Sequence, residues 1–184
     1  MERRFEDVSV ADVAGRAGVA TGLLFHYFGT KRGLFVAALE VRSAQEQARF
    51  ASNTSPDPVR WLRKELDMFL ANVAEGPQGF AGVIHGGVGA EADVQRVVQR
   101  TRDGSAARVL AKLGVGDPSP LLSLGVTTWA ASANEMAAEW IESGRKVSKA
   151  RVRSVLVATL NATLAAVAAA ESGSPFDAQT FAGA

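Results

Sequence analysis

The sequence predicts an all-α protein, with an N-terminal helix-turn-helix module over residues 1–50 and a larger helical domain over residues 51–184. Three observations lead to this prediction. Alanine, the strongest helix former, supplies 33 of the 184 residues, while β-branched and aromatic residues are modest in number. Apolar residues recur at steps of three and four along most of the chain, which is the period of a helix buried on one face. No segment shows a convincing strand alternation, and no internal repeat is evident.

Two short helices and a longer one make up the predicted N-terminal module. The first covers residues 10–17, the second begins at Thr21 and ends near Tyr27, and the third extends to about residue 50. Gly18 separates the short helices, because a glycine with positive φ commonly ends a helix. The predicted helix caps are Ser9, Thr21 and Thr30. Two short helices joined by a tight glycine turn are typical of the helix-turn-helix, in which the turn carries the second helix into the major groove of DNA.

Proline and glycine divide the larger domain into further helices. The polar segment 51–58 is predicted to be a linker, with Ser55 as a cap and Pro56 at the first position of the next helix. Residues 76–90 are glycine-rich and predict a short helix or an irregular turn, and the tail from about residue 172 is expected to be frayed. The remaining helices are predicted over about residues 59–75, 91–113, 121–143 and 148–169.

Composition argues against several classes of function. The chain has no cysteine, which excludes disulfides and thiol catalysis, and its two histidines, His26 and His85, lie far apart without metal-ligand spacing. The formal net charge is +1, yet residues 9–50 hold five basic against three acidic side chains. No apolar run approaches the roughly 18 residues of a membrane span, and the first residues lack a signal-peptide stretch. We therefore expect a cytoplasmic protein with no cofactor, no metal and no membrane contact.

One segment offers an enzyme alternative. Residues 87–92 match the loose dinucleotide-binding pattern Gly-x-Gly-x-x-Ala, preceded by the apolar pair Val83 and Ile84. The pattern requires a strand before it and a parallel sheet behind it, and no other strand is indicated. The chain also lacks an evident acid–base pair, a Ser-His-Asp order or a metal cluster. We expect a chance match and a protein that is not an enzyme, with no catalytic residues.

A specific set of residues surrounds the glycine turn. In chain order they are the cap Ser9, the pair Val13-Ala14, the turn Ala17-Gly18-Val19, the aromatic-rich stretch Phe25-His26-Tyr27-Phe28, and Lys31. This pattern resembles the DNA-binding domain of TetR-type transcriptional regulators, strongly over residues 5–50 and only in architecture beyond. The resemblance implies a one-component regulator, by family default a repressor, that binds a palindromic operator as a dimer. It also implies release from DNA by a small effector, which we expect to be apolar or amphipathic.

The resemblance also implies which residues contact double-stranded DNA. Thr21, Gly22 and Leu23 lie at the front of the recognition helix, where base edges are reached. Thr21 can form a hydrogen bond, Gly22 permits close approach, and Leu23 can meet a thymine methyl group. The expected phosphate contacts come from Ser9, Tyr27 and Lys31. His26 is expected to be a surface or partly buried residue rather than a base reader.

Two positions depart from the family pattern. Phe25 stands where the family usually has a tyrosine whose hydroxyl bonds a phosphate, and we expect Phe25 and Phe28 to belong to the core. Only a few residues precede Phe5, so the first family helix is expected to be incomplete. This second departure motivates an alternative function, namely a helical small-molecule-binding protein that has lost DNA binding.

The larger domain is expected to bind the effector and to form the dimer. Candidate ligand contacts are Trp61, Phe69, His85, Trp129, Asn134 and Met136. The aromatic residues and Met136 belong to the core by default, and the alternative is that some of them line a cavity between helices. The homodimer is expected to use the last two long helices, through alanine-rich faces formed by Ala130, Ala133, Ala137, Ala158, Ala162 and Ala165.

Overall fold

The computed structural model describes residue 5 and residues 7–76, 83, 92–171 and 176–183. Within these residues the chain forms seven helices and no strand, which confirms the all-α prediction. The helices are α1 (Val10–Ala17), α2 (Thr21–Phe28), α3 (Lys31–Ala51), α4 (Pro58–Glu75), α6 (Ala92–Lys112), α7 (Pro120–Glu142) and α8 (Lys149–Ala170). Their bounds lie close to those that the apolar periodicity predicts.

Helices α1 and α2 are joined by a tight turn at Gly18. The Ser9 hydroxyl accepts a hydrogen bond from the Asp12 amide, and the Asp12 carboxylate accepts one from the Ser9 amide, each at 3.0 Å. This reciprocal capping box fixes the start of α1. Gly18 has φ +68°, a left-handed conformation that most other residues adopt only with strain. The chain then turns at once into α2.

Two predicted caps are wrong by one or two positions. The N-cap of α2 is Ala20, which offers no side-chain hydrogen bond, and Thr21 is the first helical residue. Helix α4 is capped by Asp57, whose carboxylate accepts a hydrogen bond from the Arg60 amide at 3.0 Å, with Pro58 following it. The segment contains two pairs of a cap residue followed by proline, Ser55-Pro56 and Asp57-Pro58. The helix begins at the second pair.

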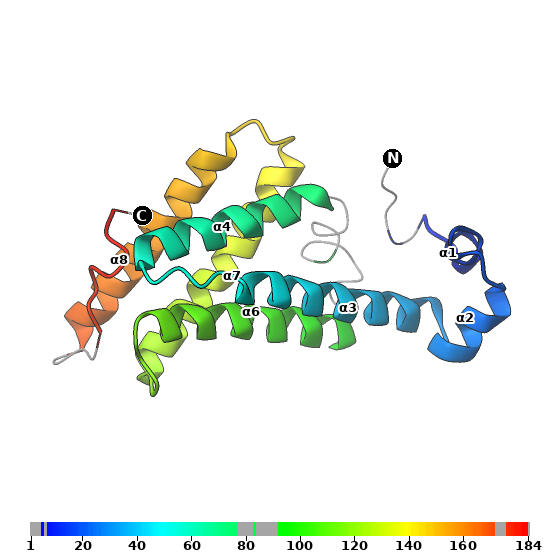
Figure 1. Ribbon diagram of the computed structural model, residues 1–184, viewed down its shortest axis with the longest axis horizontal. Coiled ribbons are helices and arrows are strands. Elements are labelled where there is room, and N and C mark those ends of the chain that lie inside the picture. The colour runs from blue at the N-terminus through cyan, green and yellow to red at the C-terminus, as the bar shows by residue number, and fades with distance from the viewer. Residues whose placement is uncertain (1–4, 6, 77–82, 84–91, 172–175, 184) are drawn as a thin grey trace.

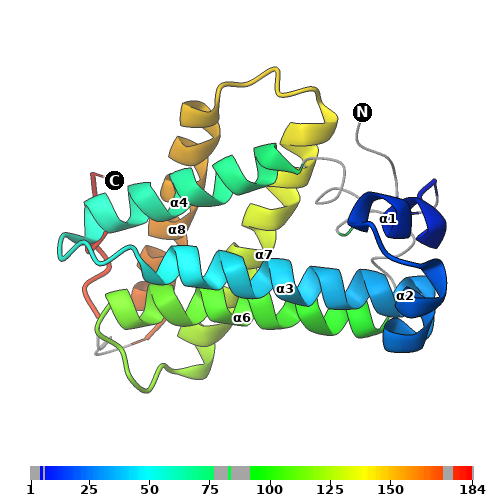
Figure 2. The ribbon, with the colours of Figure 1, turned by 45° about the vertical axis from the view of Figure 1, so that its right-hand side comes forward.

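The molecule is elongated, with α1 and α2 at one end and α8 at the other (Figure 1). Helices α3 and α6 run side by side along the length of the molecule in both ribbon views (Figure 2). Helix α3 therefore leads directly from the helix-turn-helix into the body of the larger domain.

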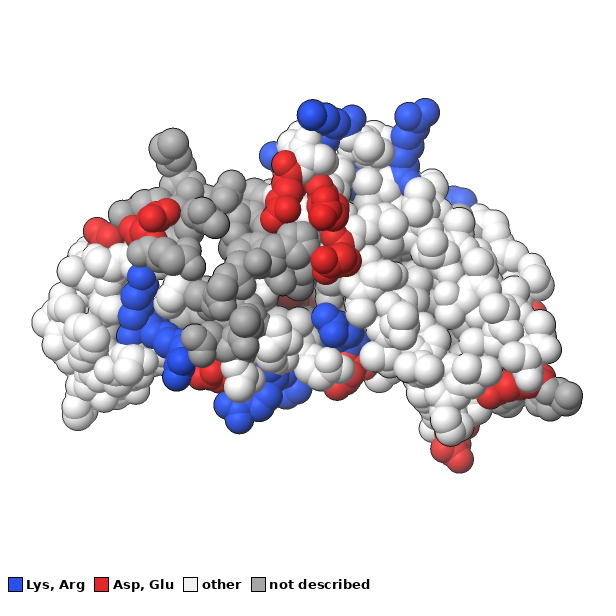
Figure 3. All heavy atoms as spheres, turned by 180° about the vertical axis from the view of Figure 1, so that it is seen from behind, with Lys and Arg blue, Asp and Glu red and all other residues white. Residues whose placement is uncertain are grey.

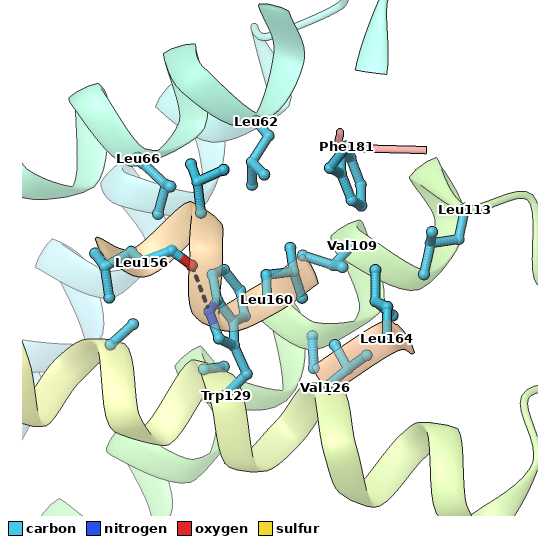
Figure 4. Packing of buried hydrophobic residues seen from close by; sticks show 14 of the residues in the cluster. Leu62, Leu66, Val109, Leu113, Val126, Trp129, Leu156, Leu160, Leu164 and Phe181 are labelled. Carbon is cyan, nitrogen blue, oxygen red and sulfur yellow. Dashed lines mark hydrogen bonds between the residues drawn. The ribbon is translucent and has the colours of Figure 1, made fainter. Parts of the chain in front are cut away.

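The main hydrophobic core lies among α4, α6, α7 and α8. Leu62 of α4, Val126 of α7 and Leu160 of α8 are fully buried there (Figure 4). The indole of Trp129 donates a hydrogen bond to the Leu156 carbonyl oxygen at 2.9 Å, so the ring's polar atom is satisfied inside the core. Helix α8 is apolar and long enough to cross a membrane. The core helix of a soluble protein passes the same test, so length and composition are weak evidence of a membrane span.

The prediction of a frayed C-terminal tail is wrong for residues 176–183. Phe176 and Phe181 belong to the core, and Phe181 is fully buried with its ring stacked on Trp61 at a centroid distance of 6.3 Å. The amide of Asn161 donates to the Phe181 carbonyl oxygen at 3.2 Å. Most residues of this segment are small or polar. Burial of the two aromatic rings nevertheless offsets the conformational entropy that the segment loses when it is ordered.

The alanine face predicted for α7 is also wrong. Ala130, Ala133 and Ala137 are buried in the core of the protomer, so they are not available to a second subunit. On α8, in contrast, Ala158, Ala162 and Ala165 are exposed. The apolar period of a helix buried on two sides does not show which side faces its own core.

Candidate nucleic-acid interface and ligand cavity

Helix α2 has no buried residue, and Phe25, His26 and Tyr27 are exposed. Leu23 is 44% exposed, Phe25 47% and Tyr27 71%. The prediction that Phe25 is a core residue is therefore wrong. Thr21, Leu24 and Phe28 are half-buried, so they form the side of the helix that packs on α1 and α3. The opposite side, with Gly22, Leu23 and His26, faces outward.

The predicted phosphate contacts lie around this exposed helix. Ser9 is exposed and caps α1, so its hydroxyl oxygen already accepts a hydrogen bond while its own proton can still be donated outward. Tyr27 packs edge-on against His26, with ring centroids 5.3 Å apart. The Lys31 ammonium lies 4.5 Å from the centroid of the Phe5 ring, at the start of α3. Lys31 thus has a structural role in holding Phe5 as well as an expected role toward phosphate.

A small cavity of about 50 Å³ lies among α4, α6 and α7, next to the end of α3. Three of the predicted ligand contacts line it, namely Phe69, Trp129 and Asn134. Its other lining residues are Phe50, Leu62, Glu65, Leu66, Ser105, Arg108, Val109, Ala130 and Ala133. A space of this size holds water-sized molecules, whereas drug-sized ligands occupy roughly 300 Å³ or more. A larger ligand therefore requires these helices to separate.

The other predicted ligand contacts lie elsewhere. Trp61 is buried beneath Phe181, and Met136 packs as a half-buried residue against the core. Neither is among the residues that line the cavity. His85 and most of the glycine-rich dinucleotide-like segment lie outside the described residues.

Two charged residues that were not among the predicted ligand contacts, Glu65 and Arg108, line the cavity. The Arg108 guanidinium donates to a Glu65 carboxylate oxygen at 2.6 Å, and the Asn53 amide donates to the other oxygen at 3.0 Å. Arg108 also lies over the Phe50 ring, 4.6 Å from its centroid. Glu65 stands at a position of α4 that the helical period assigns to the buried stripe, beside Leu62 and Leu66. A charged residue on an apolar stripe indicates a buried polar contact. The sequence does not show the partner, because Arg108 on α6 lies 43 residues away.

Helix α6 connects this cavity with the N-terminal module. Near its C-terminal end it carries Arg108, and toward its start it contacts α3 at three places. The contacts are Thr101 to Ser43 at 2.7 Å, Arg100 to Glu40 at 2.8 Å, and Asp93 to Arg32 at 3.5 Å. Arg32 follows directly after Lys31, so α6 extends from the cavity to the start of α3, next to the predicted phosphate contact.

Comparison with known proteins matches both parts of the chain. Residues 1–38 match the family model described as "Bacterial regulatory proteins, tetR family". Residues 58–163, more than half of the chain, match the model "Tetracyclin repressor-like, C-terminal domain". The chain belongs to the TetR family of bacterial regulators. It is thus a TetR-family transcriptional regulator with a DNA-binding helix-turn-helix.

A curated TetR-family relative and two solved structures agree with this assignment. The HTH-type transcriptional regulator BetI of Stenotrophomonas maltophilia is 39% identical over 64 residues, a match that spans 33% of each chain. A TetR-family regulator from Streptomyces coelicolor has a TM-score of 0.82 and 26% identity, over 92% of this chain and 76% of that one. A TetR regulator from Rhodococcus sp. RHA1 has a TM-score of 0.59 and 21% identity, over 86% and 87%, and this likeness concerns the fold alone.

Proposed function

We propose that this TetR-family chain is a cytoplasmic one-component repressor that binds a palindromic operator as a homodimer and is released by a small apolar or amphipathic effector. The observation that carries the proposal is the outward face of α2, which follows a tight turn and is not covered by the described part of the chain. A recognition helix must present such a face to enter the major groove. In this proposal residues 1–50 bind DNA and residues 51–184 bind the effector and the partner subunit.

The DNA contacts follow the positions named above. Thr21, Gly22 and Leu23 at the start of α2 are assigned to the base edges. Gly22 and Leu23 are exposed there, and the half-buried Thr21 adjoins them as the first residue of the helix. The phosphate contacts are made by Ser9, Tyr27 and Lys31. Phosphate contacts of this kind set the register of the protein on DNA, and the base contacts choose the sequence.

The homodimer in this proposal forms through α7 and α8. The two helices present a broad surface of uncharged side chains, on the right in Figure 3. Its exposed members include Leu121, Leu124, Thr128 and Ser132 on α7, and Val155, Thr159, Ala162 and Ala166 on α8. Small and apolar residues of this kind permit the close helix packing of a four-helix interface. A two-fold dimer would place two α2 helices on the two halves of a palindrome.

The effector in this proposal enters between α4, α6 and α7, where Phe69, Trp129 and Asn134 meet. Opening the cavity would displace α6, because Val109 and Arg108 line one wall. Thr101 and Arg100 contact the middle of α3, and Asp93 contacts Arg32 at its start, so that displacement would move α3 and with it α2. The effector would then favour a conformation that no longer fits the operator.

The experiment measures binding of the purified chain to DNA from upstream of its own gene and to sequences selected from a random pool. We expect Lys31→Ala to weaken binding about tenfold on every sequence, and to reduce the salt dependence by about one ion, since it removes a phosphate contact. Lys31→Arg is the matched control, because it keeps a positive charge beside the Phe5 ring and toward the proposed phosphate.

Two outcomes would contradict the proposal. If the wild-type chain enriches no DNA while small apolar compounds raise its melting temperature, it is a ligand-binding protein without operator binding. If Lys31→Ala leaves the affinity unchanged, Lys31 serves only to hold Phe5. A compound that raises the melting temperature by binding the folded state should also release the operator.

A further inference from the structure

The side chains of α2 are unusual for a helix that must distinguish bases. Its eight residues are Thr-Gly-Leu-Leu-Phe-His-Tyr-Phe, without any Arg, Lys, Asn, Gln, Asp or Glu. The common specific contacts are bidentate hydrogen bonds from Arg or Lys to guanine and from Asn or Gln to adenine. Helix α2 can make neither of them. Whatever sequence preference this helix has must come from other contacts.

The outward side of α2 is apolar at its first turn. Leu23 is 44% exposed, whereas Leu24 and Phe28 are half-buried, so a large part of the Leu23 side chain is open to solvent. An exposed leucine at the tip of a recognition helix gains nothing from water. In the major groove, the apolar group that marks a base is the 5-methyl of thymine.

Gly22, the residue before Leu23, has no explanation within the protein itself. A Cβ built there meets no atom within 4 Å, and its φ is not in the positive region. Glycine in a helix destabilises it by about 1 kcal/mol relative to alanine, so folding alone would favour alanine here. A missing side chain on an open, outward position instead permits another molecule to approach the backbone closely.

The basic residues next to α2 favour a polyanion such as DNA as that molecule. Arg16 is exposed near the end of α1, and Lys31 and Arg32 begin α3, so cationic side chains precede and follow α2 in the chain. We propose that this chain, given the operator binding proposed above, recognises its operator through thymine methyl groups that contact Leu23, with Gly22 allowing the helix to approach the base edges. The occupant of the surface is thus a T-containing half-site, and Leu23 is the residue that determines specificity.

The test begins with operators selected from random DNA by the full chain. Each thymine of the half-site is then replaced by deoxyuridine, which removes only the methyl group. We expect one position to lose affinity about fourfold, and about fifteenfold when both symmetric copies are replaced, as expected for burying one methyl per half-site. The variant Leu23→Ala should bind more weakly and lose its sensitivity to deoxyuridine at that position. Val41→Ala, an exposed apolar residue of α3, should behave as the wild type.

A second pair of variants tests the close approach. Gly22→Ala should raise the melting temperature, because alanine favours the helix, and should weaken operator binding at least tenfold. Gly15→Ala is the matched control, since its Cβ also meets nothing within 4 Å but it lies in α1. It should raise the melting temperature and leave affinity unchanged.

The outcomes separate this inference from the proposed function. If no DNA is enriched at all, the proposed operator binding fails. If operators are enriched but deoxyuridine has no effect at any position, or an effect that Leu23→Ala does not remove, operator binding stands and the thymine reading is wrong. If Gly22→Ala binds as tightly as the wild type, the close approach is wrong.

Discussion

At the scale of single residues, the buried carboxylate of Glu65 depends on two hydrogen-bond partners. Glu65 accepts hydrogen bonds from Arg108 and Asn53 and lies mostly out of water, with 10% of its side chain exposed. Taking such a carboxylate out of water costs several kcal/mol unless its partners remain in place. The three residues belong to the loop after α3, to α4 and to α6, so they hold these elements in one arrangement.

The first prediction concerns this ion pair. Arg108→Met should lower the free energy of unfolding by about 2–4 kcal/mol, because it leaves the Glu65 carboxylate with one partner in a largely apolar site. The double variant Glu65→Met with Arg108→Met should recover much of that loss, because no unpaired charge remains. Urea unfolding of the single and double variants measures both values.

The control for this prediction lies on the same helix. Arg100 and Glu40 form an ion pair at 2.8 Å, but their side chains are 64% and 49% exposed. Arg100→Met should therefore cost less than about 1 kcal/mol. If the double variant Glu65→Met with Arg108→Met is as unstable as Arg108→Met alone, lost packing causes the effect and an unpaired charge does not.

At the scale of elements, a short tail completes the core that four helices leave open. Residues 176–183 place Phe176 and Phe181 against the packed helices, and the Phe181 ring covers Trp61 of α4. Arg63 of α4 donates a hydrogen bond to the Gly183 carbonyl oxygen at 2.6 Å, which ties the segment down beyond its aromatic anchor. The tail therefore stabilises α4, which also carries four residues of the cavity wall.

Phe181→Ala should lower the free energy of unfolding by about 3–5 kcal/mol, the usual cost of removing a fully buried aromatic ring. Gln179→Ala, at an exposed position of the same segment, should change it by less than about 0.5 kcal/mol. Thermal or urea unfolding of the two variants measures the difference. Equal stabilities would mean that the tail does not contribute to the folded state in solution.

At the scale of the whole molecule, the two ends have different surfaces. The end formed by α1 and α2 exposes apolar and aromatic residues between cations, and the other end exposes the uncharged faces of α7 and α8 (Figures 1 and 3). Helices α3 and α6 connect the two ends, and polar contacts between them include Ser43 with Thr101 and Glu40 with Arg100. This arrangement suits a protein in which association at one end sets the spacing of two recognition helices at the other.

The prediction at this scale concerns association. Ala162→Arg should convert the proposed homodimer to a monomer, because it places a charge on the exposed α8 face proposed as the interface. Light scattering after size exclusion gives the mass directly. Ala107→Arg, at an exposed position of α6, is the control and should leave a dimer. A dimer in both variants would place the interface elsewhere.

The sequence alone predicted the helices and the nature of the N-terminal module, because helix periods, the Ser9 and Thr30 caps and the glycine turn depend on residues close together in the chain. Gly18 and the stretch Val10–Tyr27 carry that information locally. Tertiary structure decided which faces are covered: it exposed Phe25, buried Ala130 and seated Phe181 in the core. It also paired Glu65 with Arg108, since the approach of two helices 43 residues apart depends on packing across the whole domain and not on any local pattern.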